Sequence, residues 1–388
     1  MIDFTFYSPT YFVFGKDGQK QAGHYVKKFG GTKVLIHYGG GSVVKNGIYQ
    51  QVCESLEREK IPYLSLGGVK PNPRDGLVYQ GIELCRREQV DFILAVGGGS
   101  VIDSTKAIAA GVVYDGDFWD FYTGKLVEKA LPVGTVLTIP AAGSEGSRSS
   151  VITKEEGMLK RGADGDALRP KFSILNPELA FTLPKFQIAC GVADIMAHVM
   201  ERYFTNTKGV ELTDRLCEAV LQTMISQAPI AVEHPSDYEA QANLMWAGTV
   251  AHNNIIGVGR EQDWASHGIE HELSALYDCP HGAGLAVIFP AWMRYVMDHD
   301  IMRFAQFGSR VFGVEMDFSN PKRTAEEGIR RLKEFWKGIG LPVTFAQLGA
   351  KEEDIPKLAQ KVRYRGETIG NFVPLSPADV EEIYRLAR

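Results

Sequence analysis

Short apolar runs alternate with amphipathic stretches along the first part of the chain. The apolar runs are typical of strands buried on both faces, and they fall at residues 33–37, 61–66, 91–96 and 135–139. The stretches between them repeat apolar residues every three or four positions, which predicts helices at 46–60, at 75–88 and from about Val101 onward. Strands that alternate with helices predict a parallel sheet covered on both faces. The first part of the chain is therefore expected to be α/β.

Beyond residue 186 the apolar residues follow the helical period only. The clearest stretch, 187–203, places Ile188, Val192, Met196 and Val199 on one stripe. The same pattern predicts helices at 212–227, 238–253, 264–277, 284–296, 324–338 and 377–386. We therefore expect a boundary near residue 180, with an α/β domain at 1–180 and an all-helical domain at 181–388.

Charge and cysteine content narrow the class of protein. The chain has 388 residues and a formal net charge of −5, and this acidic balance argues against nucleic acid as a partner. It contains no apolar run long enough to span a bilayer and no signal-like pattern at 1–6, so a membrane partner is not expected. Its 5 cysteines include no Cys-x-x-Cys pair, which is typical of a reducing compartment. We expect a cytoplasmic protein.

A glycine run lies where the strand at 91–96 meets the next helix. Gly97, Gly98 and Gly99 precede Ser100, and such a strand–glycine–helix junction suits phosphate because glycine lets backbone N–H groups approach an anion. The pattern is not Gly-x-Gly-x-x-Gly. A purely structural alternative makes Ser100 the helix N-cap, with Asp103 closing a capping box. That alternative accounts for Asp103 but not for three consecutive glycines.

A second run, Gly39-Gly40-Gly41-Ser42, follows an earlier strand. Two such loops at the ends of parallel strands predict a ligand with more than one phosphate, which makes a dinucleotide the best candidate. No carboxylate stands here to bind a ribose 2′-hydroxyl, whereas Ser42 and the nearby Lys45 offer donors to a 2′-phosphate. We therefore expect NADP in preference to NAD.

Histidines and acidic residues gather in the second part of the chain. Asp194 and His198 are four residues apart on one helix face, which alone is equally typical of an exposed Asp–His pair. Three further histidines, His267, His271 and His281, fall within fifteen residues. A carboxylate together with imidazoles suits Fe²⁺ or Zn²⁺ better than Mg²⁺ or Ca²⁺, so we predict a metal site.

Two assignments of these residues stay open on the residues alone. His-x-x-Glu-His is also a zinc-peptidase motif, in which His267 and His271 bind the metal and Glu270 is the base. That assignment gives Asp194 and the glycine loops no part. The other assignment uses Asp194, His198, His267 and His281 as ligands and leaves His271 for proton transfer.

Four segments together resemble the iron-containing alcohol dehydrogenases, closest to the butanol dehydrogenase branch. They begin at Gly97, Pro140, Gly191 and Asp263, and the segment through Asp278-Cys279-Pro280-His281 is similar too. The resemblance runs over nearly the whole chain. It implies a dehydroquinate-synthase-like fold, with a dinucleotide-binding domain at 1–180 and a metal-binding and substrate domain at 181–388. It also implies hydride transfer between NAD(P) and a small primary alcohol or aldehyde such as butanol or butanal.

The resemblance also implies roles for individual residues. The family's ligands fall on Asp194, His198, His267 and His281, its non-ligand histidine near the nicotinamide falls on His271, and its cofactor lysine falls on Lys160. The full set of residues assigned to cofactor binding is Gly39, Gly40, Gly41, Ser42, Asn72, Gly98, Gly99, Ser100, Thr138 and Lys160. A homodimer is implied as well.

The chain departs from the family at two positions, where Ala142 replaces the usual threonine and Ser147 an asparagine that is often present. A non-redox, metal-dependent lyase of the same fold is a further alternative.

Overall fold

The computed structural model describes residues 1–388, and contacts between residues divide the chain into two compact units. The sheet unit comprises Tyr7–Leu183 and Pro235–Asn253. The helical unit comprises Met1–Phe6, Pro184–His234 and Asn254–Arg388. An α/β unit and an all-helical unit are the predicted fold class, which is confirmed.

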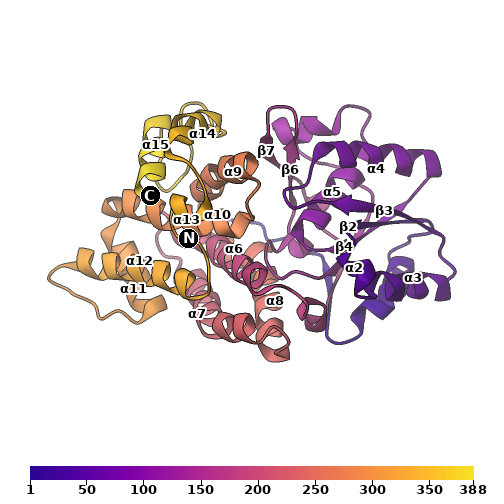
Figure 1. Ribbon diagram of the computed structural model, residues 1–388, viewed down its shortest axis with the longest axis horizontal. Helices are drawn as coiled ribbons and strands as arrows, with labels where there is room; N and C mark the ends of the chain where they lie inside the picture. Colours follow the sequence, from indigo (N-terminus) through magenta and orange to yellow (C-terminus); the bar gives the residue numbers. More distant parts are fainter. The chain divides into compact units, whose positions relative to one another are not determined.

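The sheet unit is built on one six-stranded parallel sheet, seen in the right half of Figure 1. Its strand order is β1-β8-β5-β4-β2-β3, and a separate antiparallel pair is formed by β6 and β7. The bounds are β1 Tyr11–Phe14, β2 Val34–Gly39, β3 Tyr63–Val69, β4 Phe92–Gly97, β5 Val133–Leu137, β6 Ser149–Lys154, β7 Leu159–Asp164 and β8 Phe172–Leu175.

Side chains of the central strands alternate between two buried faces, as the continuous apolar runs predict. One face carries a core cluster that includes Leu35, Ile93, Val78, Ile82 and Ile108. The other carries a cluster that includes Ile36, Leu94, Val26, Val52 and Leu56. The covering helices are α1 Ala22–Lys28, α3 Ile48–Arg58, α4 Asp75–Glu88 and α5 Gly99–Val112.

Two helices of the sheet unit differ from their predicted bounds. The helix predicted at 46–60 is α3 Ile48–Arg58, which begins after Gly47 with its φ of 76°. A separate four-residue helix that was not predicted, α2 Ser42–Lys45, precedes it. The helix predicted at 238–253 is α8 Tyr238–His252, and it packs on the sheet unit. Met245 of α8 lies in a core cluster with strand residues, and Trp246 meets Phe12 edge to face, with ring centroids 5.6 Å apart.

The helical unit contains the remaining helices, and its longest buried element is α6, from which Ile188 to Tyr203 are all buried. Isolated bridges near 365–375 are its only strand-like pairings. Its helices are α6 Lys185–Tyr203, α7 Glu211–Glu233, α9 Ala265–Tyr277, α10 His281–Val296, α11 Ile301–Phe312, α12 Pro321–Gly338, α13 Phe345–Leu348, α14 Ile355–Lys361 and α15 Pro377–Leu386.

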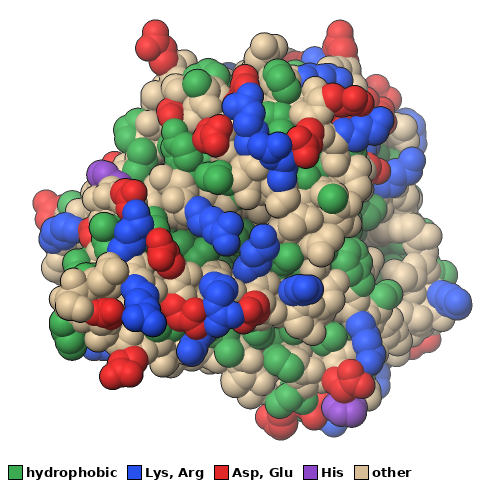
Figure 2. Space-filling view, turned by 60° about the vertical axis from the view of Figure 1, so that its left-hand side comes forward, with side chains coloured by type: hydrophobic (Ala, Val, Ile, Leu, Met, Phe, Trp, Pro, Cys, Tyr) green, Lys and Arg blue, Asp and Glu red, His purple; other side chains and the backbone are tan.

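The division into functional domains at residue 180 stays a prediction. The boundary between the contact-based units falls between Leu183 and Pro184. Residues 1–6 belong to the helical unit and residues 235–253 to the sheet unit, the reverse of the predicted ranges. None of the helices is both long enough and apolar enough to cross a bilayer. On the face that Figure 2 presents, Lys and Arg side chains are interspersed with Asp and Glu.

Candidate functional site

Helix α6 carries three polar side chains along one face. Asp194, His198 and Glu201 follow each other at spacings of four and three residues, which places them in one row. Asp194 is 4% exposed, His198 5% and Glu201 0%. The alternative of an exposed Asp–His pair is therefore wrong, because α6 is enclosed on all sides by its neighbours.

Helices α9 and α10 bring two histidines to the same place. His267 lies in the first turn of α9 and His281 is the first residue of α10. The chain reverses between the two helices at Asp278, whose φ of 50° is left-handed, and at Pro280, which precedes α10. The rings of His267 and His281 consequently have centroids 5.3 Å apart.

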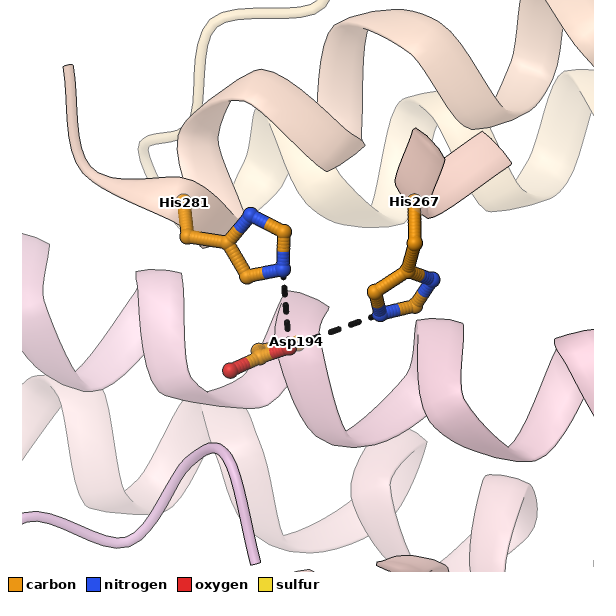
Figure 3. A group of neighbouring side chains, drawn as sticks. All are labelled: Asp194, His267 and His281. Carbon is orange, nitrogen blue, oxygen red and sulfur yellow. Dashed lines mark ion pairs between the residues drawn. The ribbon is translucent and has the colours of Figure 1, made fainter. Parts of the chain in front are cut away.

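The carboxylate of Asp194 faces all three of these histidines. Its Oδ1 atom lies 3.6 Å from His198 Nδ1, 3.7 Å from His281 Nε2 and 4.0 Å from His267 Nε2. Figure 3 shows the rings of His281 and His267 converging on Asp194 from the other two helices. Ligand atoms of Asp194, His267 and His281 all lie within 4.8 Å of one another. His198 stacks on His267, with ring centroids 4.8 Å apart, but is not part of that three-atom group.

This arrangement fits a divalent transition metal. A tetrahedral Zn²⁺ holds nitrogen and oxygen ligands at about 2.0–2.2 Å, which places neighbouring ligand atoms roughly 3.4 Å apart. The separations of 3.6–4.0 Å between Asp194 Oδ1 and the histidine nitrogens are only slightly wider. His267 Nε2 is buried and has no hydrogen-bond partner, and coordination to a cation would satisfy it. One carboxylate with imidazoles is a donor set that Fe²⁺ and Zn²⁺ accept.

Two buried glutamates hold the other nitrogen of two of the rings. Glu201 Oε1 accepts a hydrogen bond from His267 Nδ1 at 2.7 Å, and Glu270 accepts one from His281 Nδ1. Glu201 also affects a neighbouring carboxyl group. The pKa of Asp263 is raised to about 7, mainly because Asp263 is buried and in addition because the Glu201 carboxylate lies near it. Glu201 was not among the predicted site residues, although its position seven residues after Asp194 on one helix is a signal that could have identified it.

His271 lies beside this cluster. Its ring centroid is 5.5 Å from that of His281, and its ligand atom lies within 4.8 Å of those of Glu270 and His281. Glu270 is fully buried and bonded to His281, so it is not placed as the water-activating base of a peptidase. The peptidase alternative is therefore not favoured by the geometry.

The glycine loops gather at one edge of the parallel sheet. Strand β2 ends at Gly39 and β4 ends at Gly97, and these two strands are paired, with Tyr38 opposite Val96. The next strand, β5, pairs with β4 and is followed by Thr138, whose N–H donates to the Gly97 carbonyl at 3.1 Å. The carboxyl edge of an open parallel sheet is where such folds bind nucleotides.

The three consecutive glycines at the end of β4 are required by close packing. A Cβ on Gly97 would lie 2.5 Å from Val101, one on Gly98 2.9 Å from Ile139, and one on Gly99 2.8 Å from Ala142. Helix α5 begins at Gly99, so its first turn presents backbone N–H groups directly after the loop.

The predicted capping box at Ser100 and Asp103 is wrong. Gly98 is the N-cap of α5, and no side chain caps the helix. Asp103 is half-buried and accepts hydrogen bonds from Ser144 Oγ at 2.6 Å and from the Val151 N–H at 3.0 Å. Asp103 therefore bonds donors from distant segments and not the start of its own helix, because a partly desolvated carboxylate needs hydrogen-bond donors.

The buried Lys106 also binds the 143–149 loop. Lys106 Nζ donates to the Ser144 carbonyl at 2.6 Å, to the Ser147 carbonyl at 3.0 Å and to the Ser149 carbonyl at 2.9 Å. Desolvation lowers the pKa of Lys106 to about 8, and desolvation also raises the pKa of Asp103. The loop that contains Ser147, and that Ala142 directly precedes, is thus anchored by the charged side chains of Lys106 and Asp103, neither of which was predicted to bind it.

The loop after β2 is more open than the loop after β4. Gly41 has a φ of 114° and caps the four-residue helix α2, in which Ser42 and Lys45 are exposed. A Cβ on Gly40 or Gly41 would meet nothing within 4 Å. This loop therefore offers backbone and side-chain donors in open space, as recognition of a phosphate or ribose group requires.

Lys160 and Asn72 lie together although they are far apart in sequence. Lys160 Nζ, on β7, donates to Asn72 Oδ1 at 3.0 Å, and both side chains are buried. Asn72 has a φ of 51° in the turn after β3. The structure therefore pairs two of the residues assigned to the cofactor.

Comparisons with known proteins place the chain in one family. Residues 9–177 match the family described as iron-containing alcohol dehydrogenase, and residues 187–388 match its C-terminal part. NADH-dependent butanol dehydrogenase A of Clostridium acetobutylicum is 42% identical, with 99% of each chain covered. An NADPH-dependent aldehyde reductase of Escherichia coli is 35% identical, with 100% of each covered.

Solved structures agree with the sequence comparison. The crystal structure of NADH-dependent butanol dehydrogenase A from Thermotoga maritima superposes with a TM-score of 0.96 at 42% identity, covering 100% of this chain and 99% of that one. The resemblance stated from the sequence motifs is confirmed. The chain belongs to the iron-containing alcohol dehydrogenase family.

Proposed function

We propose that the chain interconverts small aldehydes and primary alcohols, such as butanal and butanol, with a nicotinamide cofactor and a divalent metal bound by Asp194, His198, His267 and His281. The observation that carries the proposal is the convergence of three imidazoles on Asp194 Oδ1 at 3.6–4.0 Å. Relatives that are 42–45% identical are named as butanol dehydrogenases, and this supports the proposed substrate class.

The chemistry divides between the bound groups and the side chains. A metal ion at this site supplies Lewis-acid polarisation of an alcohol or aldehyde oxygen, and the nicotinamide accepts or supplies the hydride. The histidines and Asp194 fix the position of the cation. The anionic Asp194 also lowers the net charge of the site and tempers its acidity.

His271 is proposed as the group that moves the proton of the alcohol. Its ring lies next to that of His281 without contributing to the three-atom group around Asp194. An imidazole accepts and releases protons near neutral pH, which suits a relay to solvent.

The sheet unit is proposed to bind the dinucleotide at the carboxyl edge of its sheet. Gly98, Gly99 and Ser100 would bind the pyrophosphate through the start of α5, supported by Thr138. The buried Lys160 and Asn72 would contact the cofactor near its reactive end.

The preference between NADP and NAD rests on the loop of Gly39, Gly40, Gly41 and Ser42. Its exposed Ser42 and the neighbouring Lys45 favour a 2′-phosphate, and we propose NADP. The named relatives include NADH-dependent enzymes at 42–45% identity and an NADPH-dependent one at 35%, so a direct comparison is the decisive test.

Steady-state kinetics test the proposal. Apoprotein is reconstituted with Fe²⁺ or Zn²⁺ and mixed with butanal and NADPH or NADH, and oxidation is followed at the nicotinamide absorbance band. We expect aldehyde-dependent oxidation that requires the metal and is lost in Asp194→Asn. Oxidation of neither cofactor over a panel of short aldehydes would contradict the proposal, and a cofactor returned unchanged with product formed would indicate the lyase alternative.

Compartment and assembly are proposed on separate features. All five cysteines are buried and free, which supports the cytoplasm. Strand β1 is an edge strand, and its exposed Phe14 meets the exposed Trp246 of α8 with ring centroids 6.4 Å apart, which supports a homodimer. A monomeric mass by light scattering would contradict the dimer.

A further inference from the structure

Two histidine rings of the cluster each present one nitrogen to Asp194 and the other nitrogen to a glutamate. In Figure 3 one nitrogen of His267 and one of His281 face Asp194, and the second nitrogen of each ring points away from it. Those second nitrogens meet carboxylates: His267 Nδ1 lies 2.7 Å from Glu201 Oε1, and His281 Nδ1 is bonded to Glu270 Oε2. The same pairing therefore occurs twice, with glutamates from two different helices, α6 and α9.

Glu201 is fixed by more than the histidine. It is fully buried, its Oε1 also accepts the backbone N–H of His267 at 3.0 Å, and its Oε2 accepts the backbone N–H of Trp264 at 2.7 Å. The Glu201 carboxylate, on α6, therefore caps the start of α9 and also fixes the orientation of the His267 ring. Trp264 has the left-handed φ of 70° that these contacts maintain.

Glu270 is confined by packing. It is also fully buried, and Gly284 of α10 lies against it, so that a Cβ on Gly284 would come within 2.3 Å of Glu270 Oε1. A larger residue at 284 would displace the carboxylate. The side chain is thus confined where it meets His281.

An ionised carboxylate accepts hydrogen bonds and donates none. Each Nδ1 bonded to a glutamate must therefore carry the proton, which leaves the lone pair on Nε2, the nitrogen that faces Asp194. A carboxylate at Nδ1 also raises the basicity of the ring and thereby its affinity for a cation.

We propose that Glu201 and Glu270 are positioning residues that select the Nδ1–H tautomer of His267 and His281 and strengthen their binding of the metal. The inference rests on the proposed function in that both histidines are taken as ligands. Glu270, which a peptidase would use as a base, acts here through His281.

The test measures metal affinity and tautomer, neither of which depends on turnover. Apoprotein of the wild type and of Glu201→Leu, Glu270→Leu and the corresponding Gln variants is titrated with Zn²⁺ against a chromophoric chelator. We expect each Leu variant to bind Zn²⁺ about 10–100-fold more weakly, and each Gln variant, which keeps an oxygen acceptor, to lose less. Selective ¹⁵N-histidine NMR of apoprotein should show the Nε2–H tautomer appearing at His267 in Glu201→Leu.

Glu218→Gln is the matched control. Glu218 is a buried glutamate of the same unit that is bonded to Tyr203 and Arg310, so removing its charge should leave Zn²⁺ affinity unchanged. If a Leu variant does not fold, the Gln variant at that position carries the test, and Gly284→Ala displaces Glu270 without altering its charge.

The outcomes separate this inference from the proposed function. Wild-type affinity and unchanged tautomers in the glutamate variants would overturn the inference, while stoichiometric Zn²⁺ lost in His267→Ala would still support the ligand set. Absence of stoichiometric binding in the wild type would overturn both. Weakening in Glu218→Gln as large as in the test variants would also overturn the inference, since burial of charge alone would then explain the effect.

Discussion

Gly282, the second residue of α10, lies against the backbone carbonyl of Cys190 in α6, so closely that a Cβ on Gly282 would be 1.9 Å from that oxygen. Asp194 follows Cys190 by about one turn, and His281 directly precedes Gly282. The close approach of these two backbones therefore sets how near His281 comes to Asp194. The lack of a side chain at position 282 is a condition for the approach of His281 to Asp194.

We expect Gly282→Ala to damage both stability and metal binding. The added methyl group meets backbone atoms that do not rotate away, so α10 must shift from α6, with a loss of about 1–3 kcal/mol or more. Urea unfolding and zinc stoichiometry measure the two effects. Gly338→Ala, on α12 with open space around it, is the control and should change neither.

His271→Ala should retain the metal but turn over slowly. Loss of a positioned proton-transfer group lowers kcat by roughly 10²-fold or more, while the ligand set around Asp194 is intact. Metal content per chain and kcat are measured together, with the exposed His299→Ala as control. Loss of stoichiometric metal in His271→Ala would instead support the peptidase assignment.

His37 should make the sheet unit less stable in mild acid. It is fully buried between Leu66 and Ser104, and burial lowers its pKa from 6.5 to about 4. The unfolded chain therefore binds the proton first, and up to about 3 kcal/mol of unfolding free energy is lost as pH falls from 6.5 to 4.

His37→Gln should flatten that pH dependence, which urea unfolding at a series of pH values measures. The exposed His24→Gln is the control and should keep the wild-type slope. An equal slope in wild type and His37→Gln would contradict the assignment of the effect to His37.

Thr249→Val tests the attachment of α8 to the sheet unit. Thr249 Oγ1 donates to Glu145 Oε1 at 2.6 Å, and burial already raises the pKa of Glu145. Removing the donor should lower the unfolding free energy by about 1–3 kcal/mol. Thr223→Val, at a half-buried site on α7 where the hydroxyl donates to the Ala219 carbonyl of its own helix, should change it little, and equal effects of the two substitutions would count against the role of Thr249.

Lys160→Met should weaken cofactor binding without affecting the metal. Its buried ammonium group bonds Asn72, and loss of a charge-assisted contact to the cofactor should raise the KM for the nicotinamide roughly tenfold or more. Lys154→Met, on the paired strand β6, serves as control. An unchanged KM in Lys160→Met would remove Lys160 from the cofactor site.

Elements with a strong local pattern were predictable from the sequence. The helix at 75–88 matches α4 residue for residue, and the strand at 91–96 is β4 displaced by one position. Strands β1 and β8 were missed because four residues are too few to establish a period. Strands β6 and β7 were missed because polar residues interrupt them.

The sequence by itself determined the class of the fold, the elements with a strong local period and the residue types of the predicted metal and phosphate motifs, because these depend on periodicity and spacing along the chain. Only the tertiary structure decided that α8 joins the sheet unit, that Asp103 bonds Ser144 instead of capping its helix, and that Glu201 and Glu270 hold two histidine rings. Those outcomes depend on which distant segments pack together. A buried polar group needs a hydrogen-bond partner, and packing decides which segment supplies that partner.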